Sequence, residues 1–224
     1  MKHILPLVGL GMALAACQPA PKAADAEQPA APQAAMEAPA GDYKLDPLHS
    51  TLIFRVNHIG FSKYVSRFET FDAALHLDPK APETSTIAVT IDPASLAVPN
   101  PPEGFLDDLR GKEWLDAKQF PAITFKSTRV EVTGPRTARV TGDFTLRGVT
   151  RPMVLEATLN GGYAGHPMDP NARVGLSATG TFKRSDFGMT YGLPDPGTTM
   201  GMGDTVEVSI ETEFTGPPLA AKAS

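Results

Sequence analysis

The chain has 224 residues, and its 20 lysines and arginines against 25 aspartates and glutamates give a formal net charge of −5 at pH 7. A nucleic-acid-binding protein would show a clustered basic face, and binding to anionic lipid head groups would need a polybasic segment. The sequence contains neither. Its single cysteine cannot form an intramolecular disulfide, so the hydrophobic core must hold the folded part together, and the length fits one domain.

The N-terminus has the pattern of a secretory signal. Lys2 supplies a positive charge, and the apolar run over residues 4–14 is shorter than the ~20 residues that a membrane span requires. The sequence LAAC at 14–17 resembles the lipobox of bacterial lipoproteins, in which the cysteine is lipidated. We therefore expect a lipoprotein signal peptide over residues 1–16, lipidation at Cys17 and a periplasmic location on a bacterial membrane. Ordinary signal cleavage, which would leave Cys17 as a free thiol, is the alternative.

The stretch over residues 17–41 is rich in alanine and proline and has no apolar periodicity, so we predict a flexible tether. An alanine-rich helix is the alternative, but the repeated prolines interrupt it. In bacterial lipoproteins, an aspartate directly after the lipidated cysteine retains the protein at the inner membrane. This chain has Gln18 at that position, so its resemblance to lipoproteins favours the outer membrane. Residues 217–224 predict a disordered tail. The folded domain is therefore expected over residues 42–216.

Within the domain, apolar and polar residues alternate with the period of two that is typical of half-buried strands. The pattern predicts about eight strands, within residues 52–56, 71–77, 87–91, 123–125, 140–146, 153–159, 174–182 and 206–214. One helix is expected within residues 104–120, and a second short helical turn around residues 59–64. The fold class is therefore all-β with one or two short helices.

Eight antiparallel strands can close as a barrel or stack as a sandwich, and the length of several of these strands favours a barrel. An eight-stranded barrel is just wide enough to be filled by its own side chains or to hold one small ligand. Small residues at inward positions leave room inside: Ala73, Ala157, Ala178, Gly142 and Gly180. The alternative is that neighbouring phenylalanines and leucines fill this room.

Four stretches, in this order, resemble the bacterial YceI-like proteins, which are also described as polyisoprenoid- or lipid-binding. They are residues 43–75, FPAITFKST at 120–128, VTGDFTLRGVTRP at 140–152 and SATGTFKRSDFG at 177–188. The resemblance implies a lipocalin-like eight-stranded antiparallel β-barrel whose interior takes a long isoprenoid or fatty chain. The chain departs from the family pattern at Phe105–Asp108, where many members carry an Arg-Asp pair and a histidine shortly after it. We therefore do not carry over a pyrophosphate-bearing ligand.

The apolar alternation, taken as inward-facing, predicts the residues of the ligand-binding wall: Phe54, Val56, Phe71, Leu75, Ile91, Phe125, Phe144, Leu176 and Phe182. Trp114 is expected either to line the ligand path or to anchor the core. His49 is a candidate polar residue at the barrel mouth, and bonding to the backbone at the start of its strand is the alternative.

No catalytic or metal site is predicted. The three histidines His49, His58 and His76 lack the close spacing of a metal site, and no nucleophile elbow accompanies them. Met189, Met200 and Met202 lie in a glycine-rich segment that is read either as an adaptable lid over the barrel mouth or as a loop without a role.

The function predicted from the sequence is extracytoplasmic lipid binding, without cofactor or bond chemistry. A long-chain isoprenoid or a fatty-acyl or amide ligand would be held inside the barrel for carriage, storage or stress response, by a monomer or homodimer. Two alternatives stay open: a filled barrel that serves as an envelope scaffold, and an enzyme acting on a lipid-like substrate.

Overall fold

The computed structural model describes residues 37–218, so Cys17, the signal peptide and most of the predicted tether lie outside the described residues. Each of the predicted strands is present in this part of the chain. The strands of the main ring are β1 (Gly41–His58), β3 (Phe71–Leu77), β4 (Thr86–Ile91), β6 (Ile123–Gly134), β7 (Thr137–Leu146), β8 (Val149–Tyr163), β9 (Asn171–Lys183) and β10 (Met202–Pro218).

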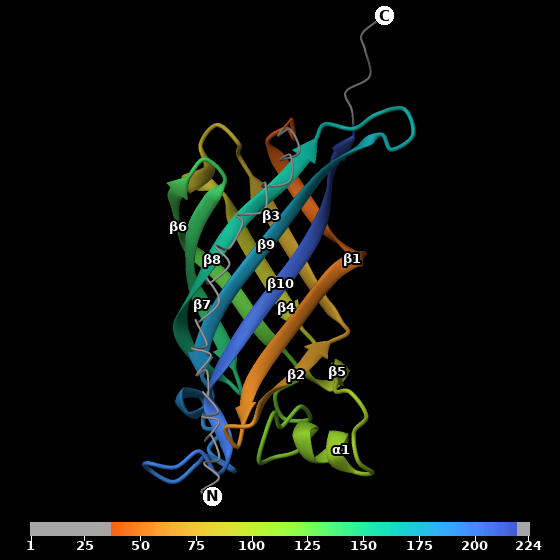
Figure 1. The fold of residues 1–224 in the computed structure, drawn as a ribbon. Coiled ribbons are helices and arrows are strands. Elements are labelled where there is room, and N and C mark those ends of the chain that lie inside the picture. Colours follow the sequence, from red (N-terminus) through yellow and green to blue (C-terminus); the bar gives the residue numbers. More distant parts are fainter. Residues whose placement is uncertain (1–36, 219–224) are drawn as a thin grey trace, which may run out of the picture. The chain divides into compact units, whose positions relative to one another are not determined.

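The ring is a closed antiparallel barrel, which confirms the predicted fold (Figure 1). Neighbours in the ring follow the order β1-β10-β9-β8-β7-β6-β4-β3, and β3 pairs with β1 again. The closing pair joins the first and last strands of the domain, in register from Lys44 opposite Thr215 to Val56 opposite Val206. Arg147 and Gly148, both with positive φ (50° and 72°), form the tight turn between β7 and β8.

The strand β1 changes its neighbour halfway along its length. Residues 41–44 pair with β3, whereas residues 52–58 pair with β2 (Ser62–Phe68), and β2 in turn pairs with the two-residue β5 (Leu96–Ala97). A bulge over residues 47–50 separates the two halves. The lower end of the barrel, drawn toward the bottom of Figure 1, is therefore completed by β2 instead of β3.

The helical turn predicted around residues 59–64 is wrong. Ile59 and Gly60 have positive φ, 46° and 77°, and with Phe61 they form a turn that leads directly into β2. The pairing of His58 with Ser62 makes this segment a hairpin. The extended pairing along β1 thus decides the conformation that the local sequence left ambiguous.

The predicted helix exists but is short. Helix α1 (Phe105–Arg110) belongs to a connector, residues 98–122, that lies at the lower end of the barrel (Figure 1). Arg110 ties the helix to the sheet, since its Nη2 donates to the carbonyl oxygen of Leu96 at 2.9 Å. None of the helices within residues 37–218 is long and apolar enough to cross a membrane.

The folded part extends slightly beyond residues 42–216 at both ends. Ala38 is buried, and the amide of Glu37 donates to the carbonyl oxygen of Gly162 at 3.0 Å. The hydroxyl of the buried Tyr43 donates to the carbonyl oxygen of Pro39 at 2.6 Å. Strand β10 continues to Pro218. The last residues assigned to the tether, 37–41, therefore pack against the barrel.

Candidate ligand-binding cavity

The lower half of the barrel encloses a cavity of about 330 Å³. Its wall is formed by inward side chains of the strands together with Phe105, Leu109, Trp114 and Leu115 of the connector. The predicted wall residues that line this lower cavity are Phe54, Val56, Ile91, Phe125, Phe144 and Phe182, and Trp114 joins them. The connector thus supplies one end wall of the cavity.

A second cavity of about 280 Å³ occupies the upper half of the barrel. The predicted residues Phe71, Leu75 and Leu176 line this upper cavity, together with Phe125. The three predicted small alanines also face it: Ala73, Ala157 and Ala178. The small side chains on the inner face therefore leave the room that the sequence indicated.

The two cavities meet at a waist of five residues that line both of them: Leu52, Val89, Phe125, Leu155 and Ile210. Two of these side chains lean against glycines in the wall. A Cβ on Gly142 would lie 2.4 Å from Cζ of Phe125, and a Cβ on Gly180 would lie 2.8 Å from Cδ2 of Leu155. Because Gly142 and Gly180 have no side chain, the ring of Phe125 and the side chain of Leu155 occupy the space next to them at the barrel wall.

One side of the lower cavity is filled by aromatic rings. Phe144, Phe182 and Phe187 pack against one another with ring centroids 5.0 to 5.5 Å apart. Edge-to-face packing of this kind adds stability beyond the apolar area that it buries. The filled-barrel alternative therefore describes part of the interior, while the two cavities occupy the rest.

Arg184 lines the lower cavity together with the connector residue Trp114. It is 2 % exposed, and its guanidinium donates to the backbone carbonyls of residues 189, 191, 202 and 203 at 2.8 to 3.0 Å. The guanidinium also lies 5.0 Å from the ring centroid of Trp114. Burial lowers the pKa of Arg184, although the side chain stays a cation.

These bonds hold the glycine- and methionine-rich segment in place at the lower end of the barrel. Met202 lines the lower cavity and Met189 is buried, whereas Met200 is exposed. Tyr191 packs on Trp114 with ring centroids 5.7 Å apart. The segment therefore lies at this end of the barrel, and its action as a lid stays a prediction.

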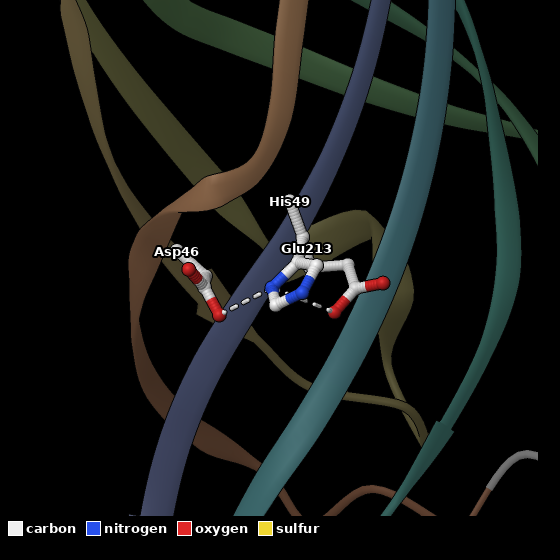
Figure 2. A group of neighbouring side chains, drawn as sticks. All are labelled: Asp46, His49 and Glu213. Carbon is white, nitrogen blue, oxygen red and sulfur yellow. Dashed lines mark hydrogen bonds and ion pairs between the residues drawn. The ribbon is translucent and has the colours of Figure 1, made fainter.

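His49 is not a cavity residue, contrary to its predicted place at the barrel mouth. It lies in the bulge of β1 with its side chain 59 % exposed, and it lines neither cavity. Figure 2 shows it between two carboxylates, with Nδ1 3.1 Å from Asp46 Oδ2 and 4.0 Å from Glu213 Oε2. Strand β1 begins at Gly41, so His49 lies at a bulge within the strand and not beside its start, as the predicted position required.

Asp46, His49 and Glu213 place three possible metal-ligand atoms within 4.8 Å of one another, which sequence spacing did not reveal because β10 supplies the glutamate. Arg173 already forms an ion pair with the Asp46 carboxylate, with Nη1 2.5 Å from Asp46 Oδ2. A cation would have to compete with this guanidinium. The ion pairs among these side chains instead connect strands β1, β9 and β10.

A closed eight-stranded antiparallel barrel with an apolar interior defines a lipocalin-like protein. Within that class the chain belongs to the YceI-like family, since residues 43–214 match the YceI-like domain. It is 35 % identical over 181 residues to the UPF0312 protein of Pseudomonas savastanoi pv. phaseolicola, a match that covers 79 % of this chain and 88 % of the relative.

Solved structures share the fold. The chain is similar to BcnA of Burkholderia cenocepacia, with a TM-score of 0.64 and 23 % identity over 75 % of this chain and 98 % of that one. It is similar to the YCEI protein of Campylobacter jejuni, with a TM-score of 0.61 and 27 % identity over 71 % and 88 % of the two chains. A polyisoprenoid binding domain from Saccharophagus degradans gives a TM-score of 0.56 at 12 % identity, over 80 % and 99 %.

The Asp46 group makes stability depend on pH. Hydrogen bonds from His49 and Arg173 lower the pKa of Asp46 from 3.8 to about 2. Because this folded-state pKa lies below the unfolded value, the ionised carboxylate stabilises the fold above about pH 4, and the contribution is lost as the pH falls toward 2. The unfolding free energy of the wild type should fall between about pH 5 and about pH 2. In Asp46→Asn, we expect this fall to be smaller than in the wild type by roughly 1–2 kcal/mol.

Denaturant titrations at several pH values measure this difference. Asp143→Asn is the matched control, because Asp143 is exposed on β7 and makes no side-chain hydrogen bond within residues 37–218. The control should keep the wild-type pH dependence. An Asp46→Asn variant that also keeps it would contradict the assignment.

Proposed function

We propose that this protein binds one long-chain lipid, an isoprenoid or a fatty-acyl chain, inside its barrel in the periplasm. The observation that carries the proposal is the pair of apolar cavities that meet at the waist within a closed barrel. Each buried methylene contributes about 0.8 kcal/mol, so a long chain binds tightly with few polar contacts.

The length of the cavities favours a chain longer than one ordinary acyl tail. On β10 the lining runs from Met202 in the lower cavity to Phe214 in the upper one. At ~3.4 Å per residue and a strand tilt of roughly 35–45°, this distance is about 30 Å along the barrel axis. The hydrocarbon core of a bilayer has a similar thickness, ~30 Å, and holds two lipid tails end to end.

Binding without bond chemistry is supported by the composition of the lining. Within residues 37–218, no aspartate, glutamate, lysine or cysteine lines either cavity. His58, Tyr64 and Ser66 do line the lower cavity, but nucleophilic catalysis needs a general base within hydrogen-bond reach of the nucleophile, and Ser66 Oγ has no such partner within residues 37–218. The name of the Saccharophagus degradans domain, polyisoprenoid binding, agrees with the ligand class that we propose.

The test is mass spectrometry of the organic extract of the natively purified protein, produced in a bacterial periplasm. We expect one isoprenoid or acyl species in a stoichiometric amount. A protein that is empty and also fails to take up added long-chain lipids would overturn the proposal in favour of a scaffold that binds a protein partner.

Filling the upper cavity should shorten the longest chain that the protein accepts. Ala178 faces this cavity from β9, and the ring of Ala178→Phe would occupy part of the volume that we propose for the ligand. We expect at least tenfold weaker binding of a long isoprenoid alcohol, since each methylene excluded from the cavity loses ~0.8 kcal/mol. A short-chain alcohol that fits the lower cavity should bind as before.

Fluorescence displacement titrations with a series of chain lengths measure this change. Val154→Phe is the control, because Val154 is 41 % exposed on the adjacent strand β8. It should leave every affinity unchanged. Equal affinities for the long chain in Ala178→Phe and the wild type would show that the upper cavity does not receive the ligand.

We also propose that a lipid on Cys17 anchors the protein to the outer membrane, with the alanine- and proline-rich segment as the tether. In Cys17→Ser, we expect the protein to move from the membrane fraction to the soluble periplasmic fraction. Intact mass spectrometry of the wild type checks the modification directly. A mature protein that begins at Ala16 with an unmodified thiol would exclude the anchor.

A further inference from the structure

The two cavities differ in the state of their polar side chains. In the upper cavity, the hydroxyls of Ser85, Thr137 and Thr212 are engaged in hydrogen bonds with neighbouring protein groups, the Ser177 hydroxyl is bonded to the exposed Glu211, and Thr86 is exposed. A polar group whose bonds are already made gains little from a ligand. The upper cavity therefore suits a hydrocarbon chain.

The lower cavity has polar groups without partners on one wall. Ser66 lines this cavity and is 4 % exposed, and its Oγ has no hydrogen-bond partner within residues 37–218. Tyr64 and His58 line the same cavity, and neither side chain makes a hydrogen bond to the described residues. We call His58, Tyr64 and Ser66 the polar strip.

The strip runs from the rim of the barrel toward its interior. His58 pairs with Ser62 at the end of the β1–β2 hairpin, whereas Ser66 pairs with Phe54, nearer the waist. Accordingly, His58 is exposed, Tyr64 is half-buried and Ser66 is buried. A chain that enters at this end would keep its oxygen-bearing group beside the strip while its tail reaches the waist.

A buried hydroxyl without a partner costs free energy, and native proteins rarely keep one without a reason. In Ser66 the cost is relieved if an occupant of the cavity supplies the missing hydrogen bond. A hydroxyl both donates and accepts, so either a hydroxyl or a carbonyl oxygen of a ligand fits.

Arg184 lines the same cavity but does not provide a clamp for a charged head group. Four of its five N–H groups already donate to backbone carbonyls, so at most one N–H remains for a ligand. Carboxylates and phosphates are usually held by paired N–H donors of an arginine. The lower cavity therefore favours a neutral polar group.

We propose that the polar strip binds the neutral oxygen-bearing end of the lipid, a hydroxyl or a carbonyl, and that the hydrocarbon chain runs past the waist into the upper cavity. This inference rests on the proposed function and adds the class and the orientation of the ligand. Long-chain alcohols, ketones and amides belong to the class, whereas plain hydrocarbons lack the anchoring group.

The experiment compares the affinities of a long-chain primary alcohol and the n-alkane of equal length for the purified protein, by competition against a bound fluorescent lipid. The wild type should prefer the alcohol by roughly tenfold, as one net hydrogen bond implies. Ser66→Ala should remove most of this preference and leave the affinity for the alkane unchanged. Its unfolding midpoint should not fall, because the substitution removes an unpartnered group.

Ser177→Ala is the matched control, since the Ser177 hydroxyl donates to the exposed Glu211 and lies outside the polar strip. It should keep the wild-type preference. A preference that survives in Ser66→Ala, or that is lost only in Ser177→Ala, would overturn the inference while alkane binding still supports the proposed function. If neither lipid binds the wild type, the proposed function itself fails, and the inference fails with it.

Discussion

The volume inside the barrel that is open to a ligand depends on how much of the interior the inward side chains fill. Eight strands enclose room for their own side chains or for one ligand. In this protein, Gly142 and Gly180 let Phe125 and Leu155 lie against the wall at the waist. The alanines above the waist add the rest of the room. Substituting either glycine would also press a Cβ against a backbone carbonyl, so the geometry of the waist and the packing of the wall are linked.

The bulge in β1 affects both the interior and the outer surface of the barrel. Outside, a chain of polar contacts runs from Tyr163 through Asp169 and Arg173 to Asp46 and His49, and it spans the closing edge of the barrel. The same bulge separates the half of β1 that pairs with β3 from the half that pairs with β2. Because β2 forms part of the lower wall, its inward residues Tyr64 and Ser66 contribute two of the three residues of the polar strip.

Much of the fold and of the apolar wall could be predicted from the sequence, because alternation with a period of two reports directly which residues face inward. Phe54, Phe125 and Phe182 follow this rule and line the lower cavity. His49 was expected at the barrel mouth because it precedes the first predicted strand, but β1 begins at Gly41 and His49 lies at its bulge. Ser66 was missed because a helical turn was predicted around residues 59–64, so β2 was not among the predicted strands. The alternation of Tyr64, Ser66 and Phe68 was the available signal.

The closing pair of strands has a consequence for the order in which the molecule forms. β1 and β10 lie at opposite ends of the domain sequence, yet each completes the wall beside the other. Contacts so distant along the chain form slowly, and an open barrel leaves unpaired strand edges beside apolar surface. A chain that emerges from its N-terminus during synthesis would hold such edges until β10 became available. Protection of β1 before the barrel closes is therefore as much a requirement of this architecture as the packing of the finished barrel.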